Sequence, residues 1–188
     1  MNEQGQNTIV ISESAMEDLR LSRIEEELKQ EITGAQLIVF QSEMNFDAEL
    51  EILRFCRANS QAQILYNPAP FRDDYDYGLI LPLVDFFIPN ETEYEQLLQK
   101  KVEIPSTVQI ILTLGEHGCK VNGNIIPPVK VTSVDSTGAG DCWIGGFCAG
   151  LVDGMSMEDA AGFANKAAAI SVTRKGAAVS IPDITEIQ

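Results

Sequence analysis

The sequence predicts an α/β fold with a doubly wound, mostly parallel sheet flanked by helices. Apolar segments of strand length alternate with amphipathic segments of helix length, which is the order expected of such a sheet. Two of the apolar segments, Ala35–Phe40 and Val108–Leu114, lack polar alternation, as strands covered on both faces do. A turn with two glycines joins a further apolar segment to a helix at residues 134–141. The chain has 188 residues and is expected to form a single domain over residues 1–188.

The elements expected in the first half follow from capping patterns and helical or extended spacing. The pattern Ser14–Glu17 is typical of a capping box at a helix start. Leu50, Leu53 and Cys56 recur at helical spacing. The expected elements are, in order, the strand Thr8–Ser12, a helix from Ser14 to about Glu31, the strand Ala35–Phe40, the helix Asp47–Asn59, the strand Gln63–Tyr66, the rigid turn Asn67–Pro70, the strand Val84–Pro89 and a helix from Asn90 through Leu98.

The second half is expected to alternate in the same way. Asn122-Gly123 is a typical hairpin turn, and Ser156 with Asp159 indicates a capped helix whose apolar face is rich in alanine. The expected elements are the strand Val108–Leu114, the loop Gly115–Gly118, a hairpin of Cys119–Val121 and Asn124–Ile126, the strand Val129–Val134, a helix from the Gly138–Asp141 turn to Asp153-Gly154, and a helix that begins at Ser156.

Composition excludes several classes of function. The net charge of −15 disfavours nucleic acid as a partner, so an anionic substrate has to be held by local amides or a metal. No apolar run reaches the ~18–20 residues that span a membrane. The single histidine, His117, excludes a histidine-rich zinc site and disfavours a Ser-His-Asp triad. The four cysteines form no CxxC pair, and the first residues lack the features of a signal peptide, so a cytoplasmic location is expected.

The segment Val134–Asp141 is the most informative part of the chain. Gly138 and Gly140 allow a crowded turn, and the first amides of the following helix form an anion site together with the helix dipole. A carboxylate at such a site repels phosphate unless it has to take a proton from an attacking hydroxyl. We therefore interpret Asp141 as a general base for phosphoryl transfer. The alternative is an ordinary strand-to-helix turn with an aspartate that the dipole favours.

Several further segments, in order along the chain, make the sequence resemble the ribokinase branch of the ribokinase/PfkB carbohydrate-kinase family. The resemblance rests on Asn90–Glu93, Thr113–Gly118, Asp135–Asp141, Phe163–Asn165 and Val172–Ala177, with Asn67–Pro70 and Gln41–Glu43 in support. It implies an ATP-dependent sugar kinase that phosphorylates D-ribose at its primary hydroxyl to give ribose 5-phosphate. Asp141 would be the base, and the amides of Gly138, Ala139, Gly140 and Asp141 would hold the transferring phosphoryl oxygens.

The resemblance also implies positions for both substrates. The implied ATP-binding residues are Asn90, Thr113, Leu114, Gly115, Glu116, His117, Gly118, Gly140, Asp141 and Asn165. For Asn165 a hydrogen-bonded core asparagine is an equally good interpretation. Glu43 would contact sugar hydroxyls together with Asp141, and the alternative for Glu43 is an exposed loop residue. Ser42 stands where the family commonly has leucine.

Two cations are implied as cofactors. Glu93 would bind Mg²⁺ through water, although Asn90 and Glu93 equally match a capping box. The implied K⁺ ligands are Asp135, Thr137, Ser171, Arg174, Gly176 and Ser180. The alternative for the last part is a cationic helix end followed by glycine.

The resemblance begins partway along the family's pattern. It implies an incomplete ribokinase-like fold without the family's N-terminal segment and most of its lid, with Thr8–Ser12 as a remnant lid strand. Most sugar contacts, and a homodimer formed through the lid, would depend on that segment. A nucleotide-binding fragment with weak or no turnover is thus an alternative, as is a PfkB-family kinase for another sugar or nucleoside. A dinucleotide-binding protein is disfavoured, because the Gly-x-Gly-x-x-Gly order is missing.

Overall fold

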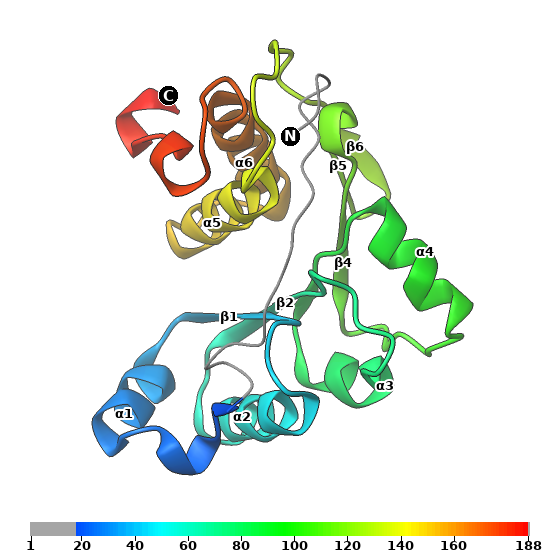
Figure 1. Ribbon diagram of the computed structural model, residues 1–188, viewed down its shortest axis with the longest axis vertical. Coiled ribbons are helices and arrows are strands. Elements are labelled where there is room, and N and C mark those ends of the chain that lie inside the picture. Colours follow the sequence, from blue (N-terminus) through cyan, green and yellow to red (C-terminus); the bar gives the residue numbers. More distant parts are fainter. Residues whose placement is uncertain (1–17, 188) are drawn as a thin grey trace. The chain divides into compact units, whose positions relative to one another are not determined.

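The computed structural model describes residues 18–187, which divide into two compact units, 18–113 and 114–187. The first is coloured from blue to green in Figure 1 and the second from green to red. Each unit is described by itself below, and the single-domain organisation stays a prediction. The expected strand Thr8–Ser12 and the expected helix start at Ser14 lie outside the described residues.

The first unit is built on four parallel strands, which confirms the predicted fold class. β1 (Leu37–Gln41), β2 (Gln63–Asn67), β3 (Phe86–Phe87) and β4 (Gln109–Thr113) pair in this order. The register places Val39 beside Leu65 and Leu65 beside Phe86. β2 and β3 are mostly buried, whereas β1 has an exposed residue, Val39, and a half-buried remainder apart from Phe40.

The helices of the first unit differ from expectation mainly at the chain start. They are α1 (Glu26–Gly34), α2 (Phe46–Asn59), α3 (Tyr77–Ile80) and α4 (Glu91–Gln99). The helix expected to run from Ser14 to about Glu31 is wrong, because residues 21–23 form a 3₁₀ turn and Ile24 is extended. Leu21 and Ile24 pack against the core in this conformation, so tertiary packing overrides helical spacing. The short helix α3 was not expected; Asp76 caps it by accepting a hydrogen bond from Gly78 N–H.

The core of the first unit lies where α2 and α3 meet the sheet. Leu53, Tyr66, Tyr77 and Phe87 are fully buried there, and the Tyr66 and Phe87 rings stack with centroids 6.2 Å apart. The strand expected over Val84–Pro89 is shorter in the structure. The N–H groups of Asp85 and Ile88, on either side of β3, still donate hydrogen bonds to carbonyls of β2. Because the four strands are parallel, their carboxyl ends lie at one edge of the sheet, where open α/β sheets bind ligands.

The second unit combines a hairpin with two long helices. β5 (Cys119–Val121) and β6 (Asn124–Ile126) pair antiparallel around Asn122 and Gly123, which both have positive φ, so the hairpin prediction is confirmed. α5 (Ala139–Val152) and α6 (Met157–Ser171) lie side by side (Figure 1). A Cβ built on Gly150 would lie 2.9 Å from Ala160 Cβ. Small residues therefore allow these helices to approach closely.

The strand expected over Val129–Val134 is wrong. Residues 127–133 have no regular hydrogen-bonding pattern, and Val129, Val131 and Val134 are exposed. Pro127 and Pro128 lack the N–H groups that a ladder requires. At the end of the segment, the N–H groups of Val134 and Asp135 both donate to the carbonyl of Val172. Among the described residues, no helix is long and apolar enough to cross a membrane.

Candidate functional site

The turn into α5 requires glycine at position 138. Gly138 is the N-terminal cap of α5, with φ 74° and ψ 7°, in the left-handed region. A Cβ at this position would also lie 3.2 Å from Ala177 Cβ. Gly140 is different, since a Cβ there would meet no atom within 4 Å. Gly138 is therefore required by the conformation of the turn. At Gly140, the space that a Cβ would occupy is open.

Asp135 anchors this turn to the segment after α6. Its side chain is 3% exposed; Oδ1 accepts a hydrogen bond from Thr137 N–H at 3.0 Å, and Oδ2 accepts one from Gly176 N–H at 2.9 Å. These donors, Gly176 first and then Thr137, hold the pKa of Asp135 below its ordinary value. Asp135 is therefore ionised and joins two loops of the second unit.

Asp141 lies in the first turn of α5 and is exposed. It also lines a cavity of about 240 Å³ within the second unit. The other lining residues come from three segments: Cys142, Gly145, Gly146 and Ala149 of α5, Phe163 and Ala167 of α6, and Ile181, Pro182, Ile184 and Ile187 near the C-terminus. Apart from Asp141 these side chains are apolar or absent, so the cavity does not test the catalytic role, and Asp141 as a general base stays a prediction.

The residues at the six positions of the implied K⁺ site have different partners within the protein. Asp135, Thr137 and Gly176 are joined by the hydrogen bonds above. The buried hydroxyls of Ser171 and Ser180 donate to carbonyls three residues earlier, Ala168 O and Ala177 O. Arg174 forms an ion pair with Glu186, so its guanidinium points to a carboxylate of the C-terminal turn. Main-chain carbonyls of this irregular segment are the oxygens that could serve a large cation.

The loop expected to bind nucleotide folds as a 3₁₀ turn over Gly115–His117, and Gly115 and Gly118 both have positive φ. A Cβ on Gly118 would lie 2.2 Å from Ile126 O. Asn165 reaches the same place, because its Nδ2 donates to Pro127 O at 2.9 Å and to Ile126 O at 3.3 Å. The structure thus brings Gly118 and Asn165 to one segment. The side chains of Glu116 and His117 are exposed.

The side chain of Asn165 already has several partners in the protein. Besides the two carbonyls, its Oδ1 accepts a hydrogen bond from Trp143 Nε1 at 2.8 Å. This is what the alternative interpretation, a hydrogen-bonded core asparagine, requires. A contact between Asn165 and a nucleotide stays a prediction.

In the first unit, the predicted site residues line the carboxyl ends of the strands. Glu43 is exposed in the loop after β1. Asn90 follows β3 and forms a parallel bridge with Thr113 at the end of β4. Gln41 Nε2 donates to Asn67 Oδ1 at 3.2 Å, which links the ends of β1 and β2. Polar groups of four neighbouring strands therefore share one edge of the sheet.

Asn90 and Glu93 form a complete capping box. Asn90 Oδ1 accepts a hydrogen bond from Glu93 N–H at 2.9 Å, and Glu93 Oε2 accepts one from Asn90 N–H at 2.8 Å. Burial raises the pKa of Glu93. The alternative interpretation is confirmed as a structural role, and the Mg²⁺ role stays a prediction that would use the remaining carboxylate oxygen.

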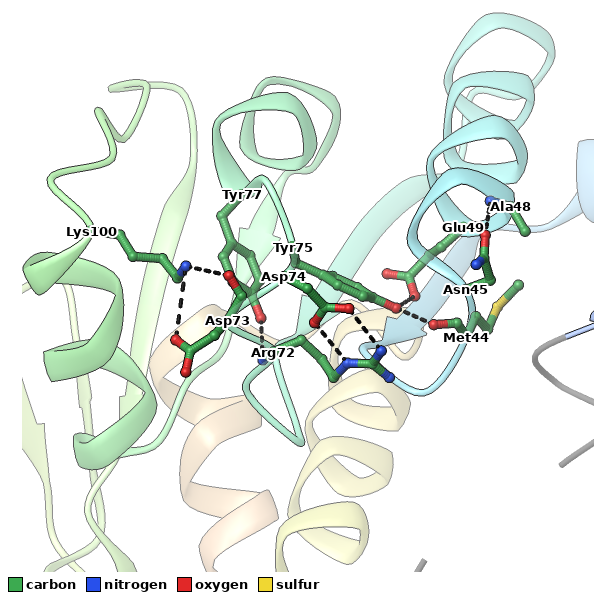
Figure 2. A network of polar contacts seen from close by, with 10 residues as sticks. All are labelled: Met44, Asn45, Ala48, Glu49, Arg72, Asp73, Asp74, Tyr75, Tyr77 and Lys100. Carbon is green, nitrogen blue, oxygen red and sulfur yellow. Dashed lines mark hydrogen bonds and ion pairs between the residues drawn. The ribbon is translucent and has the colours of Figure 1, made fainter. Parts of the chain in front are cut away.

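Sequence reasoning missed a buried polar network next to Glu43. Glu49 of α2 is 0% exposed, and its carboxyl group faces the hydroxyls of Tyr66 and Tyr75. The Tyr75 hydroxyl also contacts the carbonyl of Met44. Near Tyr75, the Arg72 guanidinium donates hydrogen bonds to the Asp74 carboxylate (Figure 2). A signal was present, because Glu49 lies three and four positions before Ile52 and Leu53 and so falls on the buried stripe of α2.

Comparison with known proteins identifies the family to which the chain belongs. The family model for pfkB family carbohydrate kinases matches residues 1–184. The chain belongs to this family. It is 32% identical to a ribokinase of Lactococcus lactis over 190 residues, and the match covers 97% of this chain and 62% of that protein. A deoxyribokinase of Salmonella typhi is 32% identical over 206 residues, covering 99% and 65% of the two chains.

A solved structure agrees with the sequence matches. The ribokinase of Giardia lamblia superposes on this PfkB-family chain with a TM-score of 0.85 and 31% sequence identity. The superposition covers 98% of this chain and 67% of the other. The chain spans 62–66% of the length of the curated ribokinases that it matches.

Proposed function

We propose that this chain is an ATP-dependent sugar kinase that transfers the γ-phosphoryl group of ATP to the primary hydroxyl of D-ribose, giving ribose 5-phosphate. The observation that carries the proposal is the turn into α5, where exposed Asp141 follows the left-handed Gly138. Membership of the carbohydrate-kinase family and the relatives named as ribokinases support it.

Asp141 would act on the acceptor. Its carboxylate takes the proton of the sugar hydroxyl while that oxygen bonds to the γ-phosphorus and the bond to the ADP oxygen breaks. Positioned in this way, a general base contributes about 10²–10⁴ in rate. The amides of Gly138–Asp141 would donate to the phosphoryl oxygens on which charge develops. Asp135 would hold this cradle rigid through Thr137 and Gly176.

The remaining predicted residues would hold the nucleotide, the sugar and the cations. ATP would lie along Thr113–Gly118 and near Asn90 and Asn165, and Glu43 would bind sugar hydroxyls. Mg²⁺ neutralises phosphate charge when bound, and Glu93 would orient its waters. K⁺ would be held beside the cradle by Asp135, Thr137, Ser171, Arg174, Gly176 and Ser180, mainly through carbonyl oxygens. An acidic chain with net charge −15 needs such local sites for an anionic substrate.

A second candidate function is nucleotide binding with weak or no turnover. It would use the Gly115–His117 turn and the first amides of α5, neither of which depends on a bound sugar. The sugar is a separate question, since a deoxyribokinase is as similar as the ribokinases. A kinase for 2-deoxyribose, another sugar or a nucleoside would use the same turn. The homodimer that the resemblance implies is a further expectation, which light scattering of the purified chain would test.

The test is an assay of the purified chain with ATP, Mg²⁺, K⁺ and D-ribose. We expect ribose-dependent formation of ADP, reduced about 10²–10⁴-fold in Asp141→Asn. Asp153→Asn removes an exposed aspartate at the other end of α5 and should keep the rate. ATP-dependent thermal stabilisation without sugar-dependent ADP would instead support the nucleotide-binding fragment. Equal rates in Asp141→Asn and the original chain would contradict the kinase mechanism.

A further inference from the structure

Glu49 is a buried carboxyl group whose neighbours are hydroxyls. Oε1 is 2.5 Å from Tyr66 Oη, and Oε2 is 3.2 Å from Tyr75 Oη. Among the described residues, no basic side chain forms an ion pair with Glu49. Burying an unpaired charge is costly, and a group so placed tends to become neutral instead.

Counting protons in the network indicates which form fits. Tyr75 has one hydroxyl proton but faces two acceptors, Met44 O and Glu49 Oε2 (Figure 2). If Glu49 is ionised, one of these buried acceptors has no proton. If Glu49 carries a proton on Oε2, it donates to Tyr75 Oη, and Tyr75 donates to Met44 O.

The other side of the carboxyl group completes the same chain. Tyr66 donates to Glu49 Oε1, and Ser42 Oγ, 3.0 Å from Tyr66 Oη, donates to Tyr66. In the neutral form each of the four groups then donates once, with no acceptor left over. Because a buried acceptor without a hydrogen bond is destabilising, and more so when it is charged, the neutral form is the one that this geometry favours.

The charged and titratable groups around Glu49 oppose this assignment only in part. They are Tyr66 on β2, Tyr77 on α3, and Arg72 and Tyr75 on the segment between β2 and α3, with Asp74 bound to Arg72. The Arg72 guanidinium lies over the Tyr75 ring and donates to both oxygens of Asp74. Burial raises the pKa of Glu49 to about 7, and the tyrosines and Arg72 offset it only in part. Burial also raises the pKa values of the three tyrosines.

We propose that Glu49 is held as a neutral acid and is a positioning residue, which fixes the loop of residues 42–45 through Tyr75 and so presents Glu43. Two residues of this loop are tied to the network, Ser42 through Tyr66 and Met44 through Tyr75. Glu43 lies between them with an exposed side chain. Its part in sugar binding rests on the function proposed above; the tie between Glu49 and the loop does not.

Hydrogen–deuterium exchange of peptides covering residues 42–49 tests the proposal without ligand or turnover. Glu43, Ala48 and Glu49 N–H groups are hydrogen-bonded there and report on the loop. With a pKa of about 7 in the closed loop and 4.5 in the open one, protection corrected for intrinsic exchange should fall about tenfold from pH 6 to pH 8.5. Glu49→Gln should show no such fall, because its amide donates to Tyr75 and does not ionise.

Two further variants serve as controls. Glu51→Gln removes an exposed carboxylate from the same helix and should behave as the original chain. Tyr75→Phe removes the donor to Met44 and should expose the loop already at pH 6, which keeps the test available if Glu49→Gln does not fold. Equal protection at both pH values in the original chain, or the same fall in Glu49→Gln, would overturn the proposal.

The kinase assay separates this proposal from the proposed function. If ribose is phosphorylated, its KM should rise between pH 6 and pH 8.5 in the original chain but not in Glu49→Gln, with kcat changing alike in both. A KM with the same pH profile in both would overturn the role of Glu49 in presenting Glu43. If no sugar is phosphorylated, the function fails, and the exchange experiment still decides the protonation of Glu49.

Discussion

Asp135 and Glu49 are both buried carboxyl groups, yet the two compact units treat them in opposite ways. Asp135 accepts from two main-chain amides, which have no lone pair to offer, so its pKa is lowered and it stays charged. Glu49 faces hydroxyls, which can donate or accept, and its pKa is raised to about 7 by burial. The hydrogen bonds lower the pKa in both cases, so the balance between these bonds and the loss of hydration sets the charge of each carboxyl group.

The largest expected effect on stability comes from disrupting the turn that Asp135 anchors, at Gly138. Gly138→Val would place a β-branched residue in the left-handed region and against Ala177, which should lower the free energy of unfolding by about 2–4 kcal/mol. Urea unfolding measures this. Gly140→Ala is the matched change, since its Cβ meets open space, and it should raise stability by about 0.5 kcal/mol. If the two variants unfold alike, the turn is not the rigid anchor that the geometry indicates.

A smaller effect, on the order of 2 kcal/mol, is expected from titrating Glu49. Its pKa is raised from 4.5 to about 7 in the folded state, so its contribution is greatest at low pH and is lost as pH rises through 7. The stability of the original chain relative to Glu49→Gln should therefore fall between pH 5 and pH 8. Asp135, with a lowered pKa, gives the opposite sign and acts only below this window.

Urea unfolding at both pH values, with Glu51→Gln in parallel, checks this difference. Glu93 also has a raised pKa, but it is present in every variant and cancels in the comparison. A stability difference that does not change with pH would show that Glu49 does not titrate in this window.

The smallest expected effect concerns the helix cap beside Glu49. Asn45 caps α2 by accepting a hydrogen bond from Ala48 N–H. Asn45→Ala should cost about 1 kcal/mol, equally at pH 5 and pH 8, because an amide side chain does not titrate. Asn59→Ala, at the exposed end of the same helix, should change stability by less than about 0.5 kcal/mol. A pH-dependent loss in Asn45→Ala would mean that the cap and Glu49 act as one unit.

Several features were predictable from the sequence because short-range rules decide them. The parallel sheet follows from apolar runs such as Val108–Leu114, the hairpin from Asn122-Gly123, and the start of α5 from Gly138 and Asp141. In each case steric limits on φ, missing amide partners or strand periodicity act within a few residues. Of these features, the start of α5 also carries part of the family resemblance, through Asp135–Asp141.

The tertiary structure alone decided the rest. The start of α1, the irregular segment at Val129 and the neutral form of Glu49 depend on partners far along the chain. Tyr66 and Tyr75 are 17 and 26 residues from Glu49, so no local pattern indicates that their hydroxyls meet its carboxyl group. Burial and hydrogen bonding fix a pKa only after the fold has brought such groups together.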